Sequence, residues 1–416
     1  MIGASVRNHL VAFYLFVSVG RVHELLPQLQ SLPFGKISLL MALLGVLFSE
    51  KEKAYETPRT RIVNVLWMLL FLALMSVFIS VWKSQSIQEI KGTVLTLFFI
   101  VYFIYLSCRT LQDVTYFINI LIIIAVVLSV SALQVKGMDR VSVSNMYDPN
   151  DLALVITTIL PLSIVKALSV TGTHRIILTT LSLLMIFAII LTGSRGGFIG
   201  MAGVFLYILF SKIPNKEGRL QKRFQLKKIF ILLFVSVLVV ILSPDNYWDR
   251  VETIFNPQQD YNVSSERGRI TLWKQGLEII ASRPYGVGIG AYPAAQGMLM
   301  GGYYQTVHNS LLLIGAELGV LGLFLYLLLY KYAFGYLSEA QNLARNGETA
   351  FAIRINYLSL SLKAALVGFF LSSFFLSQSY SPVLYTIFSL VSAFYLITYQ
   401  KCTANDDKQT NNHIYT

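Results

Sequence analysis

The feature that most constrains this chain is a succession of long apolar segments that are almost free of charged residues. A segment of about 20 apolar residues is long enough to cross the hydrocarbon core of a bilayer as an α-helix. Hydrophobic residues make up 55% of the chain and charged residues 13%, where a soluble domain has roughly 25% charged residues. A soluble globular enzyme and a disordered chain are therefore excluded, and the sequence predicts an all-α polytopic membrane protein.

The apolar segments predict about twelve membrane-spanning helices. Their expected limits are 8–25, 33–49, 62–82, 90–108, 114–134, 151–169, 175–192, 197–211, 228–243, 308–330, 352–376 and 381–399. The first has no small-residue cleavage site behind it, so we interpret it as a retained span and not a cleaved signal peptide. The chain then divides into spans within 1–243, one long, partly helical loop at 244–307, further spans within 308–399, and a tail at 400–416.

Lysine and arginine residues gather on one side of this arrangement. With a cytoplasmic N-terminus, 20 of them fall on cytoplasmic segments and seven on short outer loops and outer span ends. Basic short loops stay in the cytoplasm, so both termini are predicted to be cytoplasmic and the long loop to lie outside. The net charge of +12 therefore reflects basic residues in cytoplasmic loops. The basic 212–228 loop is better explained as a topology signal that faces anionic lipid than as a nucleic-acid site.

The single long outer loop favours an enzyme that works at the outer face. A transporter built from two repeated halves has its long connection in the middle of the chain, and no repeat is visible here. The chain has only two cysteines, Cys108 and Cys402, and no zinc-type spacing of histidines, so we expect no metal site and no cofactor.

Three outer segments carry residue types suited to an anionic ligand or to proton transfer. The first is a glycine-rich turn that contains Ser194, Arg195 and Gly196. Glycines let the backbone approach a ligand, and the guanidinium group suits phosphate. The alternative is a plain hairpin turn with a snorkelling arginine, but such an arginine is more usual on the cytoplasmic side.

The second segment predicts an amphipathic helix at about 264–280. Apolar residues recur there at helical spacing, at Ile270, Trp273, Leu277 and Ile280. Arg269 lies near the beginning of this helix, where arginine side chains and a helix N-terminus together favour anions. The alternative is a surface helix that rests on the membrane with solvated charges.

The third segment opens the tenth span with His308 and Asn309. The dipole at a helix N-terminus disfavours an imidazolium ion, so a neutral histidine able to accept a proton is expected there. The alternative is a capping or interfacial histidine. Of the five histidines, only His23 and His308 are predicted to lie outside.

Two further features have mainly structural interpretations. Asp148, with Pro149, Asn150 and Asp151 behind it, has the pattern of a helix N-cap, and a role in binding an acceptor hydroxyl is the alternative. Glu317 and Lys363 are both predicted at mid-membrane depth on adjacent helices. Since buried membrane charges usually pair, we expect an ion pair between them, with proton coupling as the alternative.

In this order, the segments of residues 140–330 resemble the O-antigen ligase family. The matching residues are Ser194–Arg195–Gly196, Arg269 with Trp273, Pro284 with Gly286 and Gly288, His308–Asn309–Ser310, Glu317 with Gly319, and Asp148–Pro149–Asn150. The resemblance implies a GT-C type helical fold in a bacterial inner membrane. It also implies metal-independent, inverting transfer of a glycan from undecaprenyl diphosphate to an acceptor hydroxyl on the periplasmic side.

For such a reaction, the residues have natural roles. His308 is the expected catalytic base, and Arg195 and Arg269 are expected to hold the donor diphosphate, with Arg267 and Arg283 as further candidates. Ser194, Gly196, Asn309, Asp148 and Asn150 are expected to support the site. The expected acceptor is lipid A–core. A polymerase that uses a second lipid-linked repeat unit, a protein O-oligosaccharyltransferase and a lipid-linked glycan transporter are the alternatives.

Overall fold

The computed structural model describes residues 5–25, 27–48, 60–135, 141–143, 148–214, 220–221, 268–301, 304–346 and 348–414. Regular structure in these residues is helical, apart from one short antiparallel pair of strands, β1 (Ile213–Pro214) and β2 (Leu220–Gln221). The predicted all-α class is confirmed for this part of the chain.

The long helices are α3 (Arg61–Ile79), α6 (Leu111–Gln134), α7 (Pro149–Ser169), α8 (Gly172–Leu191), α15 (Ser310–Leu343), α16 (Thr349–Ser373) and α17 (Pro382–Ile414). A further long helical segment joins α4 (Lys83–Glu89), a π-helical turn η3 (Ile90–Val94) and α5 (Leu95–Ser107). The shorter helices are α1 (Val6–Ser18), α2 (Phe34–Leu47), α9 (Arg195–Phe210), α13 (Arg269–Ser282) and α14 (Tyr292–Met300), with single turns η1 (Val22–Glu24), η2 (Pro27–Leu29) and η5 (Ala344–Asn346).

Eight helical segments of the described chain are long and apolar enough to cross a membrane, and α2 and α9 are apolar but shorter. The chain is therefore a polytopic membrane protein. The count of twelve spans stays a prediction, and the predicted span 228–243 lies outside the described residues.

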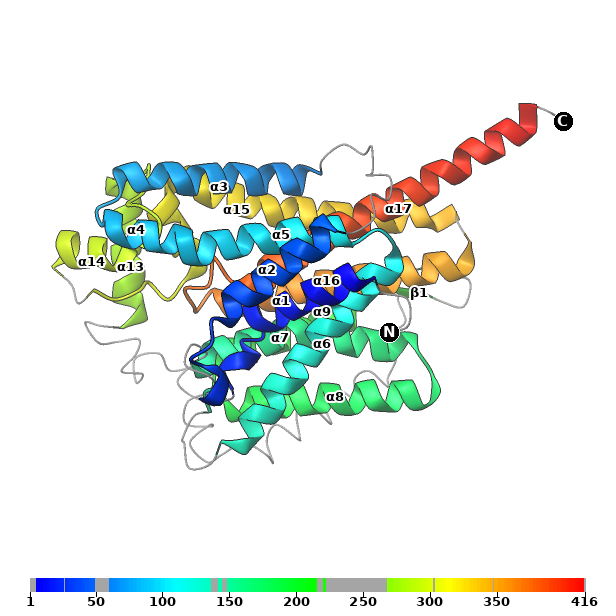
Figure 1. Cartoon of the computed structure of the whole chain (residues 1–416), viewed down its shortest axis with the longest axis horizontal. Helices are drawn as coiled ribbons and strands as arrows, with labels where there is room; N and C mark the ends of the chain where they lie inside the picture. Colours follow the sequence, from blue (N-terminus) through cyan, green and yellow to red (C-terminus); the bar gives the residue numbers. More distant parts are fainter. Residues whose placement is uncertain are drawn as a thin grey trace.

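Most of the long helices run along the long axis of the molecule (Figure 1). α13 and α14 lie at one end, which we call the α13 end. α1 begins and α17 ends toward the opposite end (Figure 1). Since α13 and α14 belong to the long predicted outer loop, the α13 end is where the predicted outer segments are expected to lie.

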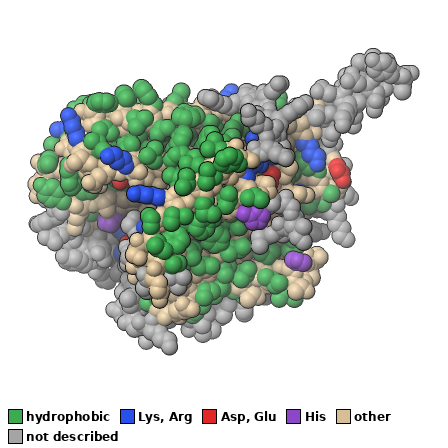
Figure 2. Space-filling model, in the orientation of Figure 1, with side chains coloured by type: hydrophobic (Ala, Val, Ile, Leu, Met, Phe, Trp, Pro, Cys, Tyr) green, Lys and Arg blue, Asp and Glu red, His purple; other side chains and the backbone are tan. Residues whose placement is uncertain are grey.

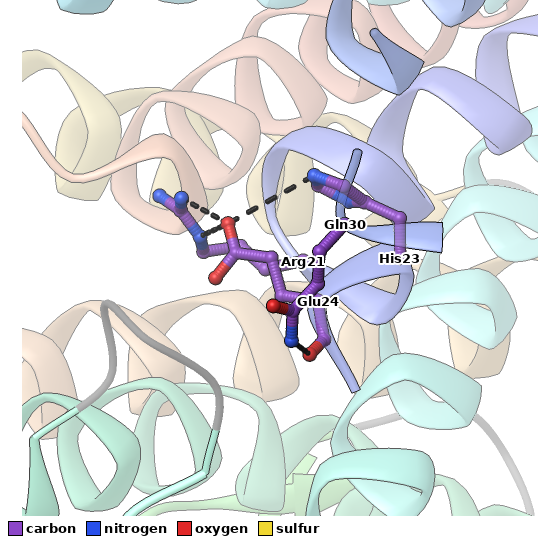
Figure 3. A network of polar contacts seen from close by, with 4 residues as sticks. All are labelled: Arg21, His23, Glu24 and Gln30. Carbon is purple, nitrogen blue, oxygen red and sulfur yellow. Dashed lines mark hydrogen bonds and ion pairs between the residues drawn. The ribbon is translucent and has the colours of Figure 1, made fainter. Parts of the chain in front are cut away.

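The first predicted span is shorter than expected. α1 has 13 residues, which extend about 20 Å, less than the roughly 30 Å of a hydrocarbon core. The residues that follow form a polar network around Glu24 (Figure 3). Arg21 Nε donates to Glu24 Oε1 at 2.6 Å, His23 Nε2 lies 3.8 Å from the same oxygen, and Gln30 Nε2 donates to the Glu24 backbone oxygen at 2.8 Å. These polar groups end the apolar segment.

Helices α7, α9 and α16 pack closely through small residues. A Cβ atom on Gly197 would lie 2.5 Å from the Cβ of Ala153 on α7. A Cβ atom on Gly200 would lie 2.9 Å from the backbone oxygen of Gly368 on α16. Small residues let membrane helices approach this closely, so the beginning of α9 is fixed against both neighbours.

Helix α15 is interrupted at Gly319, where φ is 73° and ψ is −177°. The backbone N–H of Val287 donates to the Ala316 oxygen at 2.9 Å, and that of Gly288 donates to the Glu317 oxygen at 3.1 Å. Buried backbone groups at membrane depth need partners within the protein. The connection between α13 and α14, residues 284–290, supplies the donors that the broken helix lacks, and we call it the 284–290 loop.

The predicted ion pair between Glu317 and Lys363 is wrong. Lys363 Nζ donates to Ser338 Oγ at 2.9 Å and to Gln341 Oε1 at 2.8 Å. At 1.5 Å per residue, these partners lie roughly 30 Å further along α15 than Glu317. α15 continues to Leu343, well past the predicted end of the span at residue 330, and Lys363 lies beside this extension and not beside Glu317.

Large hydrophobic side chains remain exposed along the helices and cover much of the face shown in Figure 2. On α3 alone, Trp67 is 45% exposed, Phe71 63% and Phe78 72%. An apolar surface this extensive is typical of a surface that contacts another protein or a membrane, and it would promote aggregation in water. Since the long apolar helices carry it, we interpret it as the surface that faces lipid.

Candidate active site at the α13 end

His308 lies in the turn before α15 and is held through its backbone. Its φ of 51° is in the left-handed region, which residues other than glycine seldom adopt. The His308 N–H donates to Ser377 Oγ at 2.9 Å, and the His308 carbonyl oxygen accepts from Trp273 Nε1 at 3.4 Å. Two contacts from other elements therefore support an unfavourable backbone conformation at this residue.

The connection between α16 and α17 clamps the beginning of α15. Ser310 Oγ donates to the Leu376 oxygen at 2.7 Å and accepts from the Gln378 N–H at 2.9 Å. Ser379 Oγ donates to the Ser310 oxygen at 2.6 Å. We call residues 374–379 the α16–α17 connection. Because it also bonds His308, this connection fixes both the turn and the first residue of α15.

The same connection reaches α7. Gln378 Nε2 donates to Asp151 Oδ1 at 2.8 Å. Asp148 is the N-cap of α7, as predicted, and its Oδ1 accepts from the N–H groups of Asn150 at 2.7 Å and Asp151 at 2.8 Å, with Pro149 as the first helical residue. The beginnings of α7 and α15 are thereby joined through one residue, Gln378, whose side chain bonds Asp151 and whose backbone N–H bonds Ser310.

The glycine-rich turn joins the same group of elements. Ser194 is the N-cap of α9 and accepts from the Gly197 N–H at 3.2 Å, and Arg195 is the first residue of the helix. A Cβ atom on Gly196 would lie 3.4 Å from the Cβ of Phe375. The Phe375 ring centroid in turn lies 6.1 Å from that of Trp273, the side chain that bonds His308. Three successive contacts, through Phe375 and Trp273, therefore connect the turn to the histidine.

Helix α13 begins at Arg269 and packs against α15. Its buried stripe is Leu272, Gly276 and Ile279, which differs from the apolar spacing seen in the sequence. Ile270 is 46% and Leu277 57% exposed. The helix has two apolar sides. The side that contains Gly276 faces inward, where the helix packs so closely that a Cβ atom on Gly276 would lie 2.9 Å from Val307.

Arg269 and Asp148 both act on His308 electrostatically. Burial and, second, the positive charge of Arg269 lower the pKa of His308 from its usual 6.5, while the negative charge of Asp148 opposes them. A lowered pKa keeps the imidazole neutral and able to accept a proton at neutral pH. The structure thus brings one base, one cation and one carboxylate from three separate elements together.

The remaining predicted site residues are distributed differently. Asn309 is the N-cap of α15 and accepts from the N–H groups of Leu311 and Leu312 at 2.9 and 3.0 Å. Arg283 follows the last residue of α13, roughly 20 Å along the helix from Arg269, so it does not join the group around His308. Arg267 lies outside the described residues.

Sequence reasoning missed the α16–α17 connection. Ser377 and Gln378 bond His308, Ser310 and Asp151. The sequence-based prediction ended one span at residue 376, began the next at 381, and assigned no role to the residues between them. The only signal was a polar run, Ser377 to Ser381, between two apolar helices. In the described chain, no group of three or more His, Cys, Asp or Glu residues is arranged to hold a metal ion.

Comparison with known proteins bears on this arrangement. Residues 180–327 match a family model described as O-Antigen ligase. The match supports the assignment of this chain to the O-antigen ligase family. A search of curated proteins finds no match. The matched segment contains Arg195, Arg269 and His308, whereas Asp148 and the α16–α17 connection lie outside it.

The O-antigen ligase match supports glycosyl transfer of the ligase or polymerase type, with a lipid-linked glycan and a glycan acceptor as the general partners. The resemblance noted in the sequence is thereby confirmed at the level of the family.

Proposed function

We propose that this protein transfers a glycan from undecaprenyl diphosphate to an acceptor hydroxyl, and that the acceptor is lipid A–core. It does so as a metal-independent, inverting enzyme in a bacterial inner membrane. The architecture we propose has twelve spans of GT-C type, cytoplasmic termini and the α13 end in the periplasm.

The observation that carries this proposal is the meeting of His308, Arg269 and Asp148 from three elements, in a part of the chain that matches O-antigen ligases. A diphosphate leaving group gains negative charge as its bond breaks, so fixed cations stabilise the transition state. An acceptor hydroxyl is a weak nucleophile and needs a base. The α13 end contributes both types of group.

In the proposed reaction, His308 takes the proton of the acceptor hydroxyl as its oxygen attacks the anomeric carbon. The bond between that carbon and the diphosphate oxygen breaks on the opposite side, which inverts the anomeric configuration. The diphosphate leaves with the bonding electron pair, held by Arg195 and Arg269. The negative charge of Asp148, which raises the pKa of His308, stabilises the imidazolium ion that forms.

The testing experiment uses the full chain in detergent with an undecaprenyl-diphosphate oligosaccharide and EDTA, with and without lipid A–core. We expect lipid A–core to gain mass in the presence of EDTA. His308→Ala and Arg195→Ala are expected to abolish this transfer, and Lys363→Met, which changes a charged residue far from the site, is expected to retain it.

The other outcomes separate the alternatives. A ladder formed from donor alone would replace the ligase with a polymerase. A requirement for divalent cations would overturn the metal-independent mechanism. Transfer to neither acceptor would remove both activities, and the protein-acceptor assay followed by a transport assay would come next.

A further inference from the structure

The buried carboxyl group of Glu317 binds the segment that links α13 to α14. Glu317 is 2% exposed and lies two residues before the break in α15. Its Oε1 atom accepts from the Tyr292 N–H at 3.4 Å, and the Gly290 N–H donates to the same carboxyl group. Tyr292 is the first residue of α14, so the carboxyl group accepts a hydrogen bond at the beginning of that helix, where N–H groups have no partner within the helix.

The backbone around Glu317 binds the same segment. Besides the bonds from Val287 and Gly288, the Pro284 oxygen accepts from the Val320 N–H at 2.9 Å. Only glycine fits at the two positions where the 284–290 loop and α15 approach each other most closely, Gly286 and Gly319. A Cβ atom on Gly286 would lie 2.4 Å from the Glu317 oxygen, and one on Gly319 would lie 2.4 Å from the Pro284 oxygen. Both glycines also have positive φ.

Serine side chains on and after α3 hold the 284–290 loop from its other side. Ser76 Oγ accepts from the Ile289 N–H at 3.1 Å, and Ser86 Oγ donates to the Ile289 oxygen at 2.6 Å. The loop is therefore fixed between α3, α4 and the broken part of α15. It is a rigid attachment point for the end of α13.

Helix α13 connects this attachment point to the proposed site. Its last residue precedes the 284–290 loop. Its first two turns carry Arg269, whose charge acts on His308, and Trp273, which donates to the His308 oxygen. Between these ends, Ile280 packs against Gly315 and Gly276 against Val307. A helix of 14 residues transmits a displacement of one end to the other, because its turns are hydrogen-bonded along its length.

We propose that Glu317 is a positioning residue for the transferase site: by binding the Gly290 and Tyr292 N–H groups it sets the place of α13, and with it the place of Arg269 beside His308. This rests on the proposed function. Arg195 is the matched comparison, since it belongs to α9, which packs on α7 and α16 and not on the 284–290 loop.

The test is a double-mutant cycle on the full chain in detergent, with the variants Glu317→Gln, Arg269→Met and Arg195→Met. A misplacement of about 1 Å costs up to about 100-fold in rate, so we expect Glu317→Gln to lower kcat by roughly 10- to 100-fold. In the Glu317→Gln background, Arg269→Met is expected to cost much less than in the wild type. Arg195→Met is expected to cost the same in both.

A readout independent of activity is amide hydrogen exchange. Glu317→Gln is expected to speed exchange in 286–292 and to leave α9 unchanged, and Lys363→Met is expected to change neither. Should Glu317→Gln not fold, Glu317→Asp, which keeps the carboxyl group and withdraws it by one methylene, is expected to give the same pattern with smaller changes.

Two results would overturn the proposal. One is unchanged exchange in 286–292. The other is an equal, additive loss from Arg269→Met and Arg195→Met in the Glu317→Gln background, which is the behaviour of a general loosening of the fold. If the wild type transfers no glycan at all, the proposed function fails, while the exchange experiment still decides whether Glu317 holds the loop.

Discussion

His308 combines a strained backbone with two supporting contacts from other elements. Strained residues persist where the surrounding structure over-determines them, and they gather at active sites. Ser377 supports the N–H side and Trp273 the carbonyl side. The direction of the imidazole therefore depends on a serine that belongs to a different pair of helices.

We expect Ser377→Ala to lower kcat by roughly 2- to 10-fold with little change in KM, the effect of losing the partly buried hydrogen bonds from the His308 N–H and from Thr306 Oγ1. The measurement is steady-state transfer in detergent. Ser389→Ala is the control, because Ser389 Oγ bonds only the Tyr385 oxygen of its own helix. Equal losses in the two variants would contradict a specific role of Ser377.

Removing the charge of Arg269 and removing the charge of Asp148 are expected to shift the pH dependence of kcat/KM in opposite directions. A base must be neutral, so the rate falls as pH drops through the pKa of His308, which burial and Arg269 hold below 6.5. Arg269→Met removes a charge that lowers this pKa, so the acid limb of kcat/KM moves to higher pH. Asp148→Asn removes a charge that raises it, so the acid limb moves to lower pH. Shifts in the same direction would exclude His308 as the titrating base.

Local patterns indicate residues that can cap helices, and tertiary contacts decided the rest. Asp148 acts as the predicted N-cap. Ser194 and Asn309 also act as N-caps, a role that was not predicted for them although both are residue types common at that position. The roles of Ser377 and Glu317 depend on partners far away in the sequence, and no local pattern specifies which backbone groups they will meet.

At the scale of elements, the beginning of α9 depends on a glycine at the contact with α7. We expect Gly197→Ala to destabilise the protein by about 1–3 kcal/mol through overpacking against Ala153. Thermal unfolding in detergent measures this change. Gly35→Ala on α2, which meets nothing within 4 Å, is the control and is expected to be neutral or stabilising, because alanine favours helix. A destabilisation as large at Gly35 would refute the packing argument.

Hydropathy predicted where helices occur. It predicted less well where each helix ends or is interrupted. Every predicted span within the described residues contains a helix. α1 ends early because Arg21 and Glu24 form a polar network, and α15 breaks at Gly319 because another segment supplies the hydrogen bonds. The polar residues Arg21, His23 and Glu24 are visible in the sequence at the first place. At the second place, the apolar sequence continues past Gly319 and does not show which segment supplies the hydrogen bonds.

At the scale of the whole molecule, the proposed orientation predicts which turns are accessible from outside the cell. In a variant without Cys108 and Cys402, we expect a membrane-impermeant maleimide to label Ser282→Cys on intact cells. Thr171→Cys, an exposed position in the turn between α7 and α8, is expected to react only after permeabilisation. The reverse pattern would invert the topology.

The order of the outer motifs along the chain was enough to indicate the family, and charge counting was enough to predict an orientation. Neither predicts which motifs touch. The path from Gly196 through Phe375 and Trp273 to His308 exists because α9, α13, α15 and α16 pack at one end of the bundle, and packing of that kind follows from side-chain shape more than from hydropathy.

The break at Gly319 also ties the biogenesis of this protein to the order of its synthesis. In hydrocarbon, each unpaired backbone group costs several kcal/mol, and the partners of the Ala316 and Glu317 oxygens come from residues 287 and 288. That segment leaves the ribosome before α15 does, and in the proposed orientation it is already exported when α15 follows. The tenth predicted span therefore does not partition into the bilayer as an independent unit: its insertion is completed by an exported segment that folds back onto it.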